Sequence, residues 1–275
     1  MKISVALCTY NGEQFIEEQL DSIFAQTLPV NEIIICDDCS TDNTGLILQK
    51  YILNYPDIIK LHHNKKALKT IKNFEKAVSL TTGDYIFLCD QDDIWKNNKV
   101  EKMVSLMEEN NEILLLFSNG HLINSDNVSL KSTLWEHWKF DKQKRKEWTK
   151  NFHAFRSLLV GRNYVTGATA MIRRGLLRNA IPIEVPSLYY HDTWFALHAA
   201  AKNGLRFIDD SLINYRIHDN QQVGITAGGK NVISTICEKN ISQESFIKNI
   251  SEKYPYLALR IRFWSFCHII KNRLL

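Results

Sequence analysis

This chain of 275 residues lacks any long uninterrupted hydrophobic run. A helix that crosses a membrane needs about 20 consecutive apolar residues, and no stretch approaches that length. The apolar segment at residues 3–8 is also too short for a secretory signal before polar residues follow. We therefore expect a cytoplasmic protein, or one that is peripheral on the inner face of the cytoplasmic membrane.

The chain also lacks a strong excess of charge of one sign. Its formal net charge is +4, and its first two-thirds contain no basic stripe interleaved with aromatic residues. A dedicated nucleic-acid-binding protein needs such a surface. We therefore expect no nucleic-acid partner.

A second pair of closely spaced cysteines is missing as well. Cys36 and Cys39 form a CxxC sequence, but no further pair follows to complete a zinc site. Cys8, Cys36 and Cys89 each lie near the end of an apolar run, where cysteine behaves as a small hydrophobic residue. We expect free thiols, with a redox role for the CxxC pair as the weaker alternative.

What the sequence does have is a regular alternation of strand and helix patterns. Short apolar runs at residues 3–8, 32–36, 58–61 and 85–89 alternate with helical patterns at residues 12–26, 45–55 and 70–80. This alternation predicts an α/β fold with a doubly wound, mostly parallel sheet flanked by helices. Further along we expect a helix at 97–110, a strand at 113–117, a helix at 191–203 and strands at 205–208 and 212–215.

Two segments depart from this alternation. Residues 136–152 are polar, basic and rich in tryptophan, which predicts a surface insertion. The composition changes again after residue 225. We therefore expect a catalytic domain at residues 1–225 and a helical, basic and aromatic C-terminal appendage at residues 226–275.

The most informative segment is the acidic run that follows the apolar strand at residues 85–89. Asp90, Asp92 and Asp93 come directly after it, and open α/β sheets bind ligands just beyond the carboxyl ends of their strands. Carboxylates this close raise one another's pKa unless a cation lies among them. The run predicts a divalent metal that bridges to nucleotide phosphates. The alternative is an acidic turn that only begins the next helix.

Two more acidic clusters lie at Asp37-Asp38 and at His191-Asp192, and polar residues 9–12 follow the first strand. In this order the segments resemble the family 2 glycosyltransferases, enzymes of the GT-A fold that use nucleotide sugars. The resemblance covers about residues 1–220, and its motifs are residues 4–12, 37–42, 90–95, 191–194 and 215–218. The form of residues 90–95 and 191–194 is most similar to the rhamnosyltransferase-like branch that builds bacterial surface polysaccharides.

The resemblance implies an inverting transferase that moves a hexosyl or rhamnosyl unit. The donor would be a UDP- or dTDP-linked sugar, and the acceptor a hydroxyl of a growing glycan or lipid-linked glycan. The implied nucleotide-binding residues are Thr9, Tyr10, Asn11, Asp37, Asp38, Asn73, Asp90 and Gln91. Either Asp37 or Asp38 would accept the N3–H of a uracil or thymine ring; Asp38 is favoured, but the sequence does not separate them.

The resemblance also assigns the chemistry. Asp92 would bind Mn²⁺ or Mg²⁺, with His218 completing the metal or diphosphate site, and the metal would neutralise the departing nucleoside diphosphate. Asp192 would be the catalytic base, although it could instead only cap a helix. His191, Trp194 and Arg216 would lie on the acceptor or diphosphate side. The family commonly has Glu-Asp where His191-Asp192 stands, which leaves the role of His191 open.

Three other classes of protein compete with this interpretation. A sugar nucleotidyltransferase needs an N-terminal glycine-rich, basic phosphate loop, whereas residues 9–13 contain one glycine and no Lys or Arg. A phosphatase with a DxD nucleophile would carry that motif after the first strand. A non-catalytic sugar-binding module would have no need for both a metal site and a base.

The C-terminal segment at residues 253–275 is not explained by the resemblance. It has five Lys and Arg residues, many aromatic residues, and no Asp or Glu. Such a mixture is typical of a helix that lies on an anionic membrane surface, although its apolar residues form no single stripe. The equal alternatives are a helix docked on the catalytic domain and a contact in a homodimer.

Overall fold

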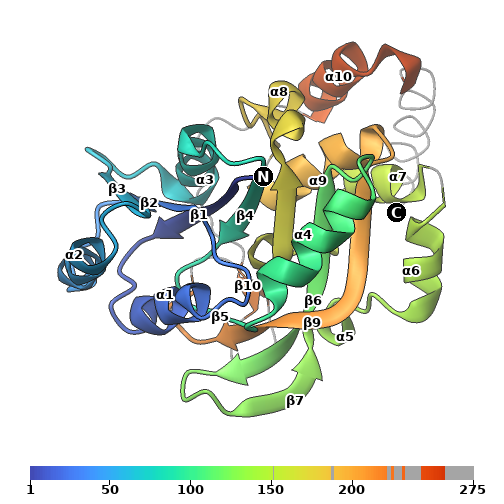
Figure 1. Ribbon diagram of the computed structural model, residues 1–275. Coiled ribbons are helices and arrows are strands. Elements are labelled where there is room, and N and C mark those ends of the chain that lie inside the picture. The colour runs from blue at the N-terminus through green and yellow to red at the C-terminus, as the bar shows by residue number, and fades with distance from the viewer. Residues whose placement is uncertain (151, 187–188, 222–223, 226–230, 233–242, 258–275) are drawn as a thin grey trace.

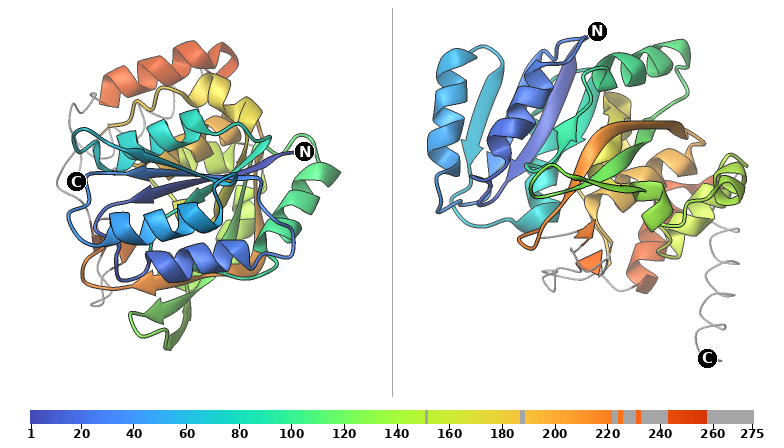
Figure 2. Two further views of the ribbon diagram at one scale, coloured as in Figure 1. Left: turned by 60° about the vertical axis from the view of Figure 1, so that its left-hand side comes forward. Right: turned by 90° about the horizontal axis from the view of Figure 1, so that it is seen from below.

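The computed structural model describes residues 1–150, 152–186, 189–221, 224–225, 231–232 and 243–257. A sheet of nine strands forms its centre, and helices cover both faces (Figures 1 and 2). Helices α1 and α2 lie on one face, and α3 lies on the other with α8 and α10 (Figure 2, left). The strand order is β3-β2-β1-β4-β8-β6-β9-β5, with β7 paired to β6. The predicted α/β fold with a mostly parallel sheet is confirmed.

The first four strands in this order form a parallel, locally connected unit. Its strands are β1 (Ile3–Thr9), β2 (Glu32–Asp37), β3 (Ile59–His63) and β4 (Tyr85–Cys89), and its helices are α1 (Ile16–Phe24), α2 (Thr44–Asn54) and α3 (Lys69–Leu80). Every residue of β2 and β4 is buried because helices cover both faces. Parallel pairing sets Thr9 beside Asp37 and Leu7 beside Cys89. The loops after β1, β2 and β4 therefore leave the sheet at one edge.

The rest of the sheet is mixed. Strand β8 (Ala170–Arg173) is antiparallel to both β4 and β6 (Leu115–Asn124), so β6 runs in the same direction as β4. Strand β9 (Leu205–Ile217) is parallel to β6. The carboxyl ends of β6 and β9 therefore lie at the same edge as those of β1, β2 and β4.

Strand β9 is one continuous strand, where the sequence predicted two. The exposed Asp209 and Asp210 interrupt its apolar pattern. Its register against β6 shifts on both sides of Asn119, which leaves these acidic residues outside the ladder. A bulge thus absorbs the polar residues without ending the strand.

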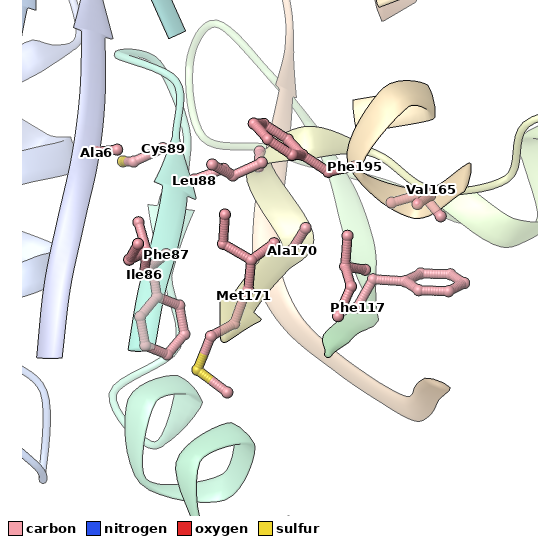
Figure 3. Close-up of a cluster of buried hydrophobic side chains, with 14 of the residues drawn as sticks. Ala6, Ile86, Phe87, Leu88, Cys89, Phe117, Val165, Ala170, Met171 and Phe195 are labelled. Atoms are coloured by element: carbon pink, nitrogen blue, oxygen red, sulfur yellow. The ribbon is translucent and has the colours of Figure 1, made fainter. Parts of the chain in front are cut away.

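The remaining elements connect or cover these strands. They are β5 (Ile94–Trp95), α4 (Lys99–Glu109), β7 (Ser129–Thr133), α5 (Leu134–His137), α6 (Lys142–Trp148), α7 (His153–Leu159), η1 (Gly167–Thr169), η2 (Arg174–Leu176), α8 (Leu177–Ala180), α9 (His191–Ala201), β10 (Gly224–Ile225), β11 (Asn231–Val232), α10 (Gln243–Lys253) and η3 (Pro255–Leu257). In the core, Phe87 and Leu88 of β4 lie between Ala6 of β1 and Met171 of β8 (Figure 3).

The segment predicted as a surface insertion is anchored to the sheet by aromatic side chains. Phe140 and Trp148 are buried, and their rings pack against Phe117 of β6. Charged residues of α6 such as Lys142 and Lys146 are exposed. The segment is thus polar only on its outer side.

The first part of the C-terminal region packs against α9. Phe246 of α10 is fully buried beside the rings of Tyr189 and Trp194. The Tyr254 hydroxyl lies 2.5 Å from Nδ1 of the buried His198. Residues 243–257 are therefore docked against α9. The membrane, docked-helix and homodimer alternatives concern residues 253–275, of which residues 258–275 lie outside the described residues. Within the described ranges, no helix is both long and apolar enough to cross a membrane.

Candidate active site

An open cleft of about 630 Å³ lies where the loops after β1, β2 and β4 meet. Its lining includes seven of the residues singled out from the sequence: Thr9, Tyr10, Asp38, Asn73, Asp90, Gln91 and Asp92. It also includes Cys8, Thr70, Phe74, Tyr215, Asn220 and Gln221, which the sequence interpretation did not assign to the site. Tyr215 lies three residues before His218 in the last motif, and Asn220 and Gln221 follow that histidine. Their closeness to His218 in the sequence could have placed these three residues at the site.

Gln91 joins the loop after β4 to the loop after β1. The backbone amide of Tyr10 donates to Oε1 of Gln91 at 2.8 Å, and Nε2 of Gln91 donates to the carbonyl oxygen of Tyr10 at 3.0 Å. A Cβ atom on Gly12 would lie only 2.3 Å from the same Oε1. A larger residue at Gly12 would therefore displace this amide, and Gln91 fixes the loop that exposes the Tyr10 ring to the cleft.

Asn11 connects the loops after β1 and β2 but does not line the cleft. Its backbone has a φ of 48°, in the left-handed region that asparagine tolerates. Its Oδ1 accepts from the backbone amide of Thr41 at 2.8 Å, and its own amide donates to Oγ of Ser40 at 2.9 Å. Asn11 therefore supports the cleft from outside.

The structure separates the two aspartates that the sequence left together. Asp37 accepts from the Thr9 hydroxyl at 2.9 Å, and its other oxygen lies 3.3 Å from Nδ1 of His63. It also accepts from the amide and hydroxyl of Ser40. These contacts place Asp37 behind the cleft, where it orders the turn after β2.

Asp38 lines the cleft and anchors the start of α3. Its Oδ1 accepts from the amide of Leu68 at 2.6 Å and from Nδ2 of Asn64 at 2.7 Å, and its Oδ2 accepts from the amide of Lys69 at 2.8 Å. A carboxylate offers about four lone-pair sites. One site on Oδ2 is therefore left to accept a further hydrogen bond.

Asn73 forms part of the cleft wall between Asp38 and β2. It is buried, donates to the carbonyl oxygen of Cys36 at 2.8 Å, and accepts from Asn64 at 2.8 Å. Asn64 bonds Asp38 as well. The amide of Asn73 thus belongs to the network that holds Asp38.

The acidic loop after β4 has the electrostatic properties expected from its sequence. Burial, together with the charges of Asp92 and Asp192, raises the pKa of Asp90 to about 7. Burial likewise raises the pKa of Asp93 well above its ordinary value, with Asp92 and Asp90 adding to the rise. The Oδ2 of Asp93 has no hydrogen-bond partner among the described residues. The loop holds more negative charge than its protein surroundings neutralise.

Asp92 and His218 are suited to hold a divalent metal. Nε2 of His218 lies 2.9 Å from Oδ2 of Asp92, and Asp92 faces the cleft. No three Asp, Glu, His or Cys side chains in the described part of the chain form a complete metal site by themselves. Mg²⁺ in nucleotide enzymes commonly takes one or two carboxylates plus substrate phosphates, and Mn²⁺ has similar ligand preferences. The residues present therefore fit a metal that a diphosphate and water help to bind.

Arg216 lies behind the acidic loop instead of facing a diphosphate. Its side chain is fully buried, its Nε donates to the carbonyl oxygen of Asp92 at 2.7 Å, and its Nη2 donates to Oε2 of Glu18 at 2.6 Å. Its backbone amide donates to Asp93 at 3.0 Å. The guanidinium is used to position the acidic loop, so the prediction that it faces the acceptor or diphosphate is not what the structure shows.

Trp194 is also placed away from the cleft. It is fully buried, and its indole Nε1 donates to the carbonyl oxygen of Ala180 at 2.6 Å. Its ring packs against His198 of the same helix. Trp194 holds α9 against α8 and does not line the cleft.

Asp192 lies at the start of α9 and close enough to the acidic loop to act on Asp90. Burial raises its pKa to about 6, although the nearby amides of Thr193 and Gly167 oppose the shift. The bond from Thr193 shows that Asp192 does satisfy one amide of its own helix. A capping role alone does not explain why Asp192 lies beside the acidic loop.

His191 is a buried, neutral ring. Its plane stacks on Phe74 with ring centroids 3.8 Å apart, and burial lowers its pKa to about 3. Neither ring nitrogen has a partner among the described residues. Phe74 itself lines the cleft, so His191 supports that wall.

Lys99 is the charged residue that the sequence interpretation missed. It is fully buried at the start of α4, and burial lowers its pKa to about 7. It lies four residues before Met103 on the buried stripe of this helix. This helical spacing could have predicted that Lys99 is buried. Its charge acts on both Asp90 and Asp93.

An α/β sheet with an acidic cleft beyond the carboxyl ends of its parallel strands is the arrangement in which such folds bind nucleotides. The family model described as "Glycosyl transferase family 2" matches residues 4–180. This chain belongs to that family.

Curated relatives include bacterial proteins that are named as glycosyltransferases. The chain is 30% identical to "dTDP-rhamnosyl transferase RfbG" of Shigella flexneri over 225 residues, which are 79% of this chain and 73% of that protein. It is 38% identical to "Putative glycosyltransferase EpsE" of Bacillus subtilis over 108 residues, 39% of each protein. It is 33% identical over 127 residues to "UDP-Glc:alpha-D-GlcNAc-diphosphoundecaprenol beta-1,3-glucosyltransferase WfgD" of Escherichia coli, covering 46% of this chain and 48% of that one. The matches thus span less than half of the latter two proteins.

Among solved structures, the fold resembles that of S. aureus TarS residues 1–349 in complex with UDP-GlcNAc. The TM-score is 0.63 at 19% identity, and the match covers 92% of this chain and 65% of that one. At this identity the likeness supports the GT-A fold alone.

Proposed function

We propose that this protein is an inverting, metal-dependent glycosyltransferase. It moves a hexosyl or rhamnosyl unit from a UDP- or dTDP-linked sugar to a hydroxyl of a growing, lipid-linked bacterial surface glycan. One observation carries this proposal: Asp90 and Asp92 of the metal-type loop line the cleft, and the carboxylate of Asp192 lies close enough to this loop that its charge raises the pKa of Asp90. The named activities of the relatives from Shigella flexneri and Escherichia coli support the donor class.

The nucleotide would lie along Thr9, Tyr10 and Asn73, which line the cleft beside Asp38. Asp38 has one carboxylate site left after anchoring α3, and that site suits the single N3–H of uracil or thymine. Asp37 is occupied behind the cleft. We therefore assign recognition of the base to Asp38.

Asp92 and His218 would hold Mn²⁺ or Mg²⁺, with Asp90 nearer the ribose. When bound, the cation supplies Lewis-acid stabilisation of the departing nucleoside diphosphate. Arg216 and Gln91 keep the loop in place through backbone contacts on its two sides. Their role is to position the ligands of the metal.

Asp192 would remove the proton of the acceptor hydroxyl as its oxygen attacks the anomeric carbon. The bond from that carbon to the diphosphate oxygen breaks in the same step, so the configuration inverts. A carboxyl group with a pKa of about 6 is ionised at neutral pH and is a stronger base than an ordinary aspartate. A single positioned carboxylate is sufficient for this step.

The acceptor class suggests work at the inner face of the cytoplasmic membrane. The proposed contact is through the basic and aromatic residues after Leu257, because α10 itself is packed against α9. A homodimer contact through the same residues is the competing proposal. Both concern residues outside the described ranges.

A direct test is incubation of the purified protein with a panel of UDP- and dTDP-sugars and Mn²⁺, without acceptor. We expect slow release of nucleoside diphosphate from one donor and none in excess EDTA. Release of pyrophosphate from a nucleoside triphosphate and a sugar phosphate would instead indicate a nucleotidyltransferase. Donor binding without any turnover, even with acceptor extracts, would favour a non-catalytic module.

A further inference from the structure

A buried lysine connects the two parts of the site that carry the chemistry. Lys99 has no exposed surface, and its Nζ donates to the carbonyl oxygen of Ala168 at 2.7 Å. Lysine is almost never fully buried unless its charge is compensated. Its position therefore calls for a reason beyond the packing of α4.

The aromatic side chains around Lys99 hold its ammonium in a defined place. Nζ lies 3.9 Å from the ring centroid of Trp95 and 5.8 Å from that of Phe87. Trp95 belongs to the segment directly after the acidic loop, and Phe87 to the strand directly before it. The cation thus lies beneath the acidic loop, and attraction to both ring faces favours it there.

The turn that Lys99 bonds also lies beside Asp192. Ala168 is the middle residue of η1, and the amide of its neighbour Gly167 is close enough to the Asp192 carboxylate to lower its pKa. A Cβ atom on Gly167 would lie 2.7 Å from Nε2 of His191, so the turn is packed directly against the start of α9. A shift of this turn would therefore move the proposed base.

The charge of Lys99 also acts on the acidic loop. It opposes the mutual repulsion of Asp90 and Asp93, which burial and nearby carboxylates make costly to ionise. One side chain thus contacts the turn behind the base and lies in the field of the metal-binding loop. Among the described residues, no other lysine or arginine opposes the raised pKa of Asp90.

We infer that Lys99 is a positioning residue that sets the proposed base, Asp192, against the metal-binding loop through the hydrogen bond to Ala168. The expected effect on kcat rests on the proposed function. The positioning of Asp192 by Lys99 does not. Removing the hydrogen bond and the charge should impair turnover without impairing donor binding. Loss of the cation leaves the loop at least as attractive to Mn²⁺, so metal-dependent binding of nucleoside diphosphate should not weaken.

The kinetic test uses Lys99→Met, which keeps most of the side-chain volume, and Lys99→Gln, which keeps an N–H donor for Ala168. We expect kcat of Lys99→Met to fall about 10- to 100-fold, as for a displacement of about 1 Å, with donor KM within about twofold of wild type. Lys99→Gln should lose less. The matched control is Lys102→Met on the same helix, where the lysine is exposed and pairs with Asp210, and its kcat should equal that of wild type.

Wild-type kcat in Lys99→Met, or equal losses of kcat and of Mn²⁺-dependent nucleotide binding, would overturn the inference. If Lys99→Met does not fold, the same comparison is made with Lys99→Leu, which also lacks a donor for Ala168: an unchanged kcat overturns the inference, and a fall at constant donor KM supports it.

The geometric test does not need the substrate to be known. Crystal structures of wild type and of Lys99→Met, or of Lys99→Leu where Lys99→Met does not fold, should show the Gly167–Thr169 turn and the Asp192 carboxylate displaced relative to Asp90. An unmoved turn and carboxylate would overturn the inference even if the transferase activity is established. A displaced turn in a protein that releases no nucleoside diphosphate would support the positioning role and refute the proposed function alone.

Discussion

The two halves of the sheet present their functional residues in different ways. In the parallel half, β3-β2-β1-β4, each strand pairs with its neighbours in one direction, and the loops after β1, β2 and β4 line the cleft directly. In the mixed half, β8-β6-β9-β5, neighbouring strands come from distant segments and run in both directions. The first half supplies the nucleotide cleft by simple succession, whereas the second supplies Asp192 and His218 only through long-range pairing.

Buried acidic residues also differ between the two edges of the parallel half. The parallel half has an acidic network at its amino edge, where Glu32 is buried among Ser4, Thr82 and lysines. At its carboxyl edge the acids remain incompletely neutralised. The satisfied network suits stability, and the unsatisfied one suits binding of a cation. Variants that affect one property and not the other can test this division.

The largest effect is expected from the metal loop. Asp92→Ala should abolish transfer and weaken binding of nucleoside diphosphate in Mn²⁺, because the side chain that holds the cation is lost. The melting temperature without ligand should stay near that of wild type. The control is Asp57→Ala, which removes an exposed aspartate just before β3, at the edge of the sheet opposite the cleft. Full transfer by Asp92→Ala, or by wild type in excess EDTA, would refute the metal role.

The next effect concerns the mixed half. Asp192→Asn keeps the size of the side chain but removes its basicity, so turnover should fall about 10²- to 10⁴-fold while donor binding survives. Steady-state kinetics with separate donor binding measurements would show this. Wild-type turnover would show that another group is the base. Retained anomeric configuration in the product, by NMR, would contradict single displacement.

The pH dependence of the rate gives a finer test of the same residue. Burial raises the pKa of Asp192 to about 6, and only the ionised form accepts a proton. At saturating Mn²⁺ and donor, the rate should therefore fall as pH drops below about 6, approaching tenfold per pH unit. In Asp192→Asn this acid limb should be absent. A wild-type profile that stays flat down to pH 4 would be incompatible with Asp192 as the base.

A smaller effect, on stability alone, is expected at the amino edge of the parallel half. Burial of Glu32 raises its pKa, but hydrogen bonds from Ser4 and Thr82 outweigh it and lower the pKa to about 2. A lowered pKa stabilises the folded state above the unfolded value of about 4.3, and this contribution is lost as pH falls toward 2. Glu32→Gln should lower the free energy of unfolding by about 2 kcal/mol at pH 7, with kcat unchanged. Denaturant unfolding at pH 7 and pH 3 should show the difference between the two proteins shrinking in acid; a constant difference would argue against the charge.

The smallest effect on the fold should come from the C-terminal region. A protein that ends at Leu257 keeps the packing of Phe246 and Tyr254 on α9 and should unfold like the full-length chain. It should lose sedimentation with anionic liposomes at low salt if the tail binds membrane. Truncation after Gly229 also removes Phe246, whose loss alone would cost about 3 kcal/mol, so it should fold poorly. Equal liposome binding by the full-length chain and the form that ends at Leu257 would favour the docked-helix alternative.

The sequence by itself predicted most of the parallel half. Apolar runs, helical spacing and polar strand ends are local properties, and Asp38, Asp90 and Asp92 lie at the cleft because each directly follows a strand. That Asp192 lies near these residues was predicted from the resemblance to the family, whose motifs occur in the same order along the chain. Local pattern and order along the chain were sufficient for these positions.

Only the tertiary structure decided what the buried polar groups do. Asp37 and Asp38 are adjacent in sequence, yet their roles differ because their partners come from the β3–α3 segment and from β1. Arg216 donates to Glu18, which is distant in the sequence, and Lys99 donates to Ala168. Both side chains are buried, although from residue type alone a lysine or arginine is expected to be exposed. The physical reason is that a buried charge is acceptable only where distant segments supply its hydrogen bonds and counter-charges, and those partners are set by strand pairing rather than by neighbouring residues.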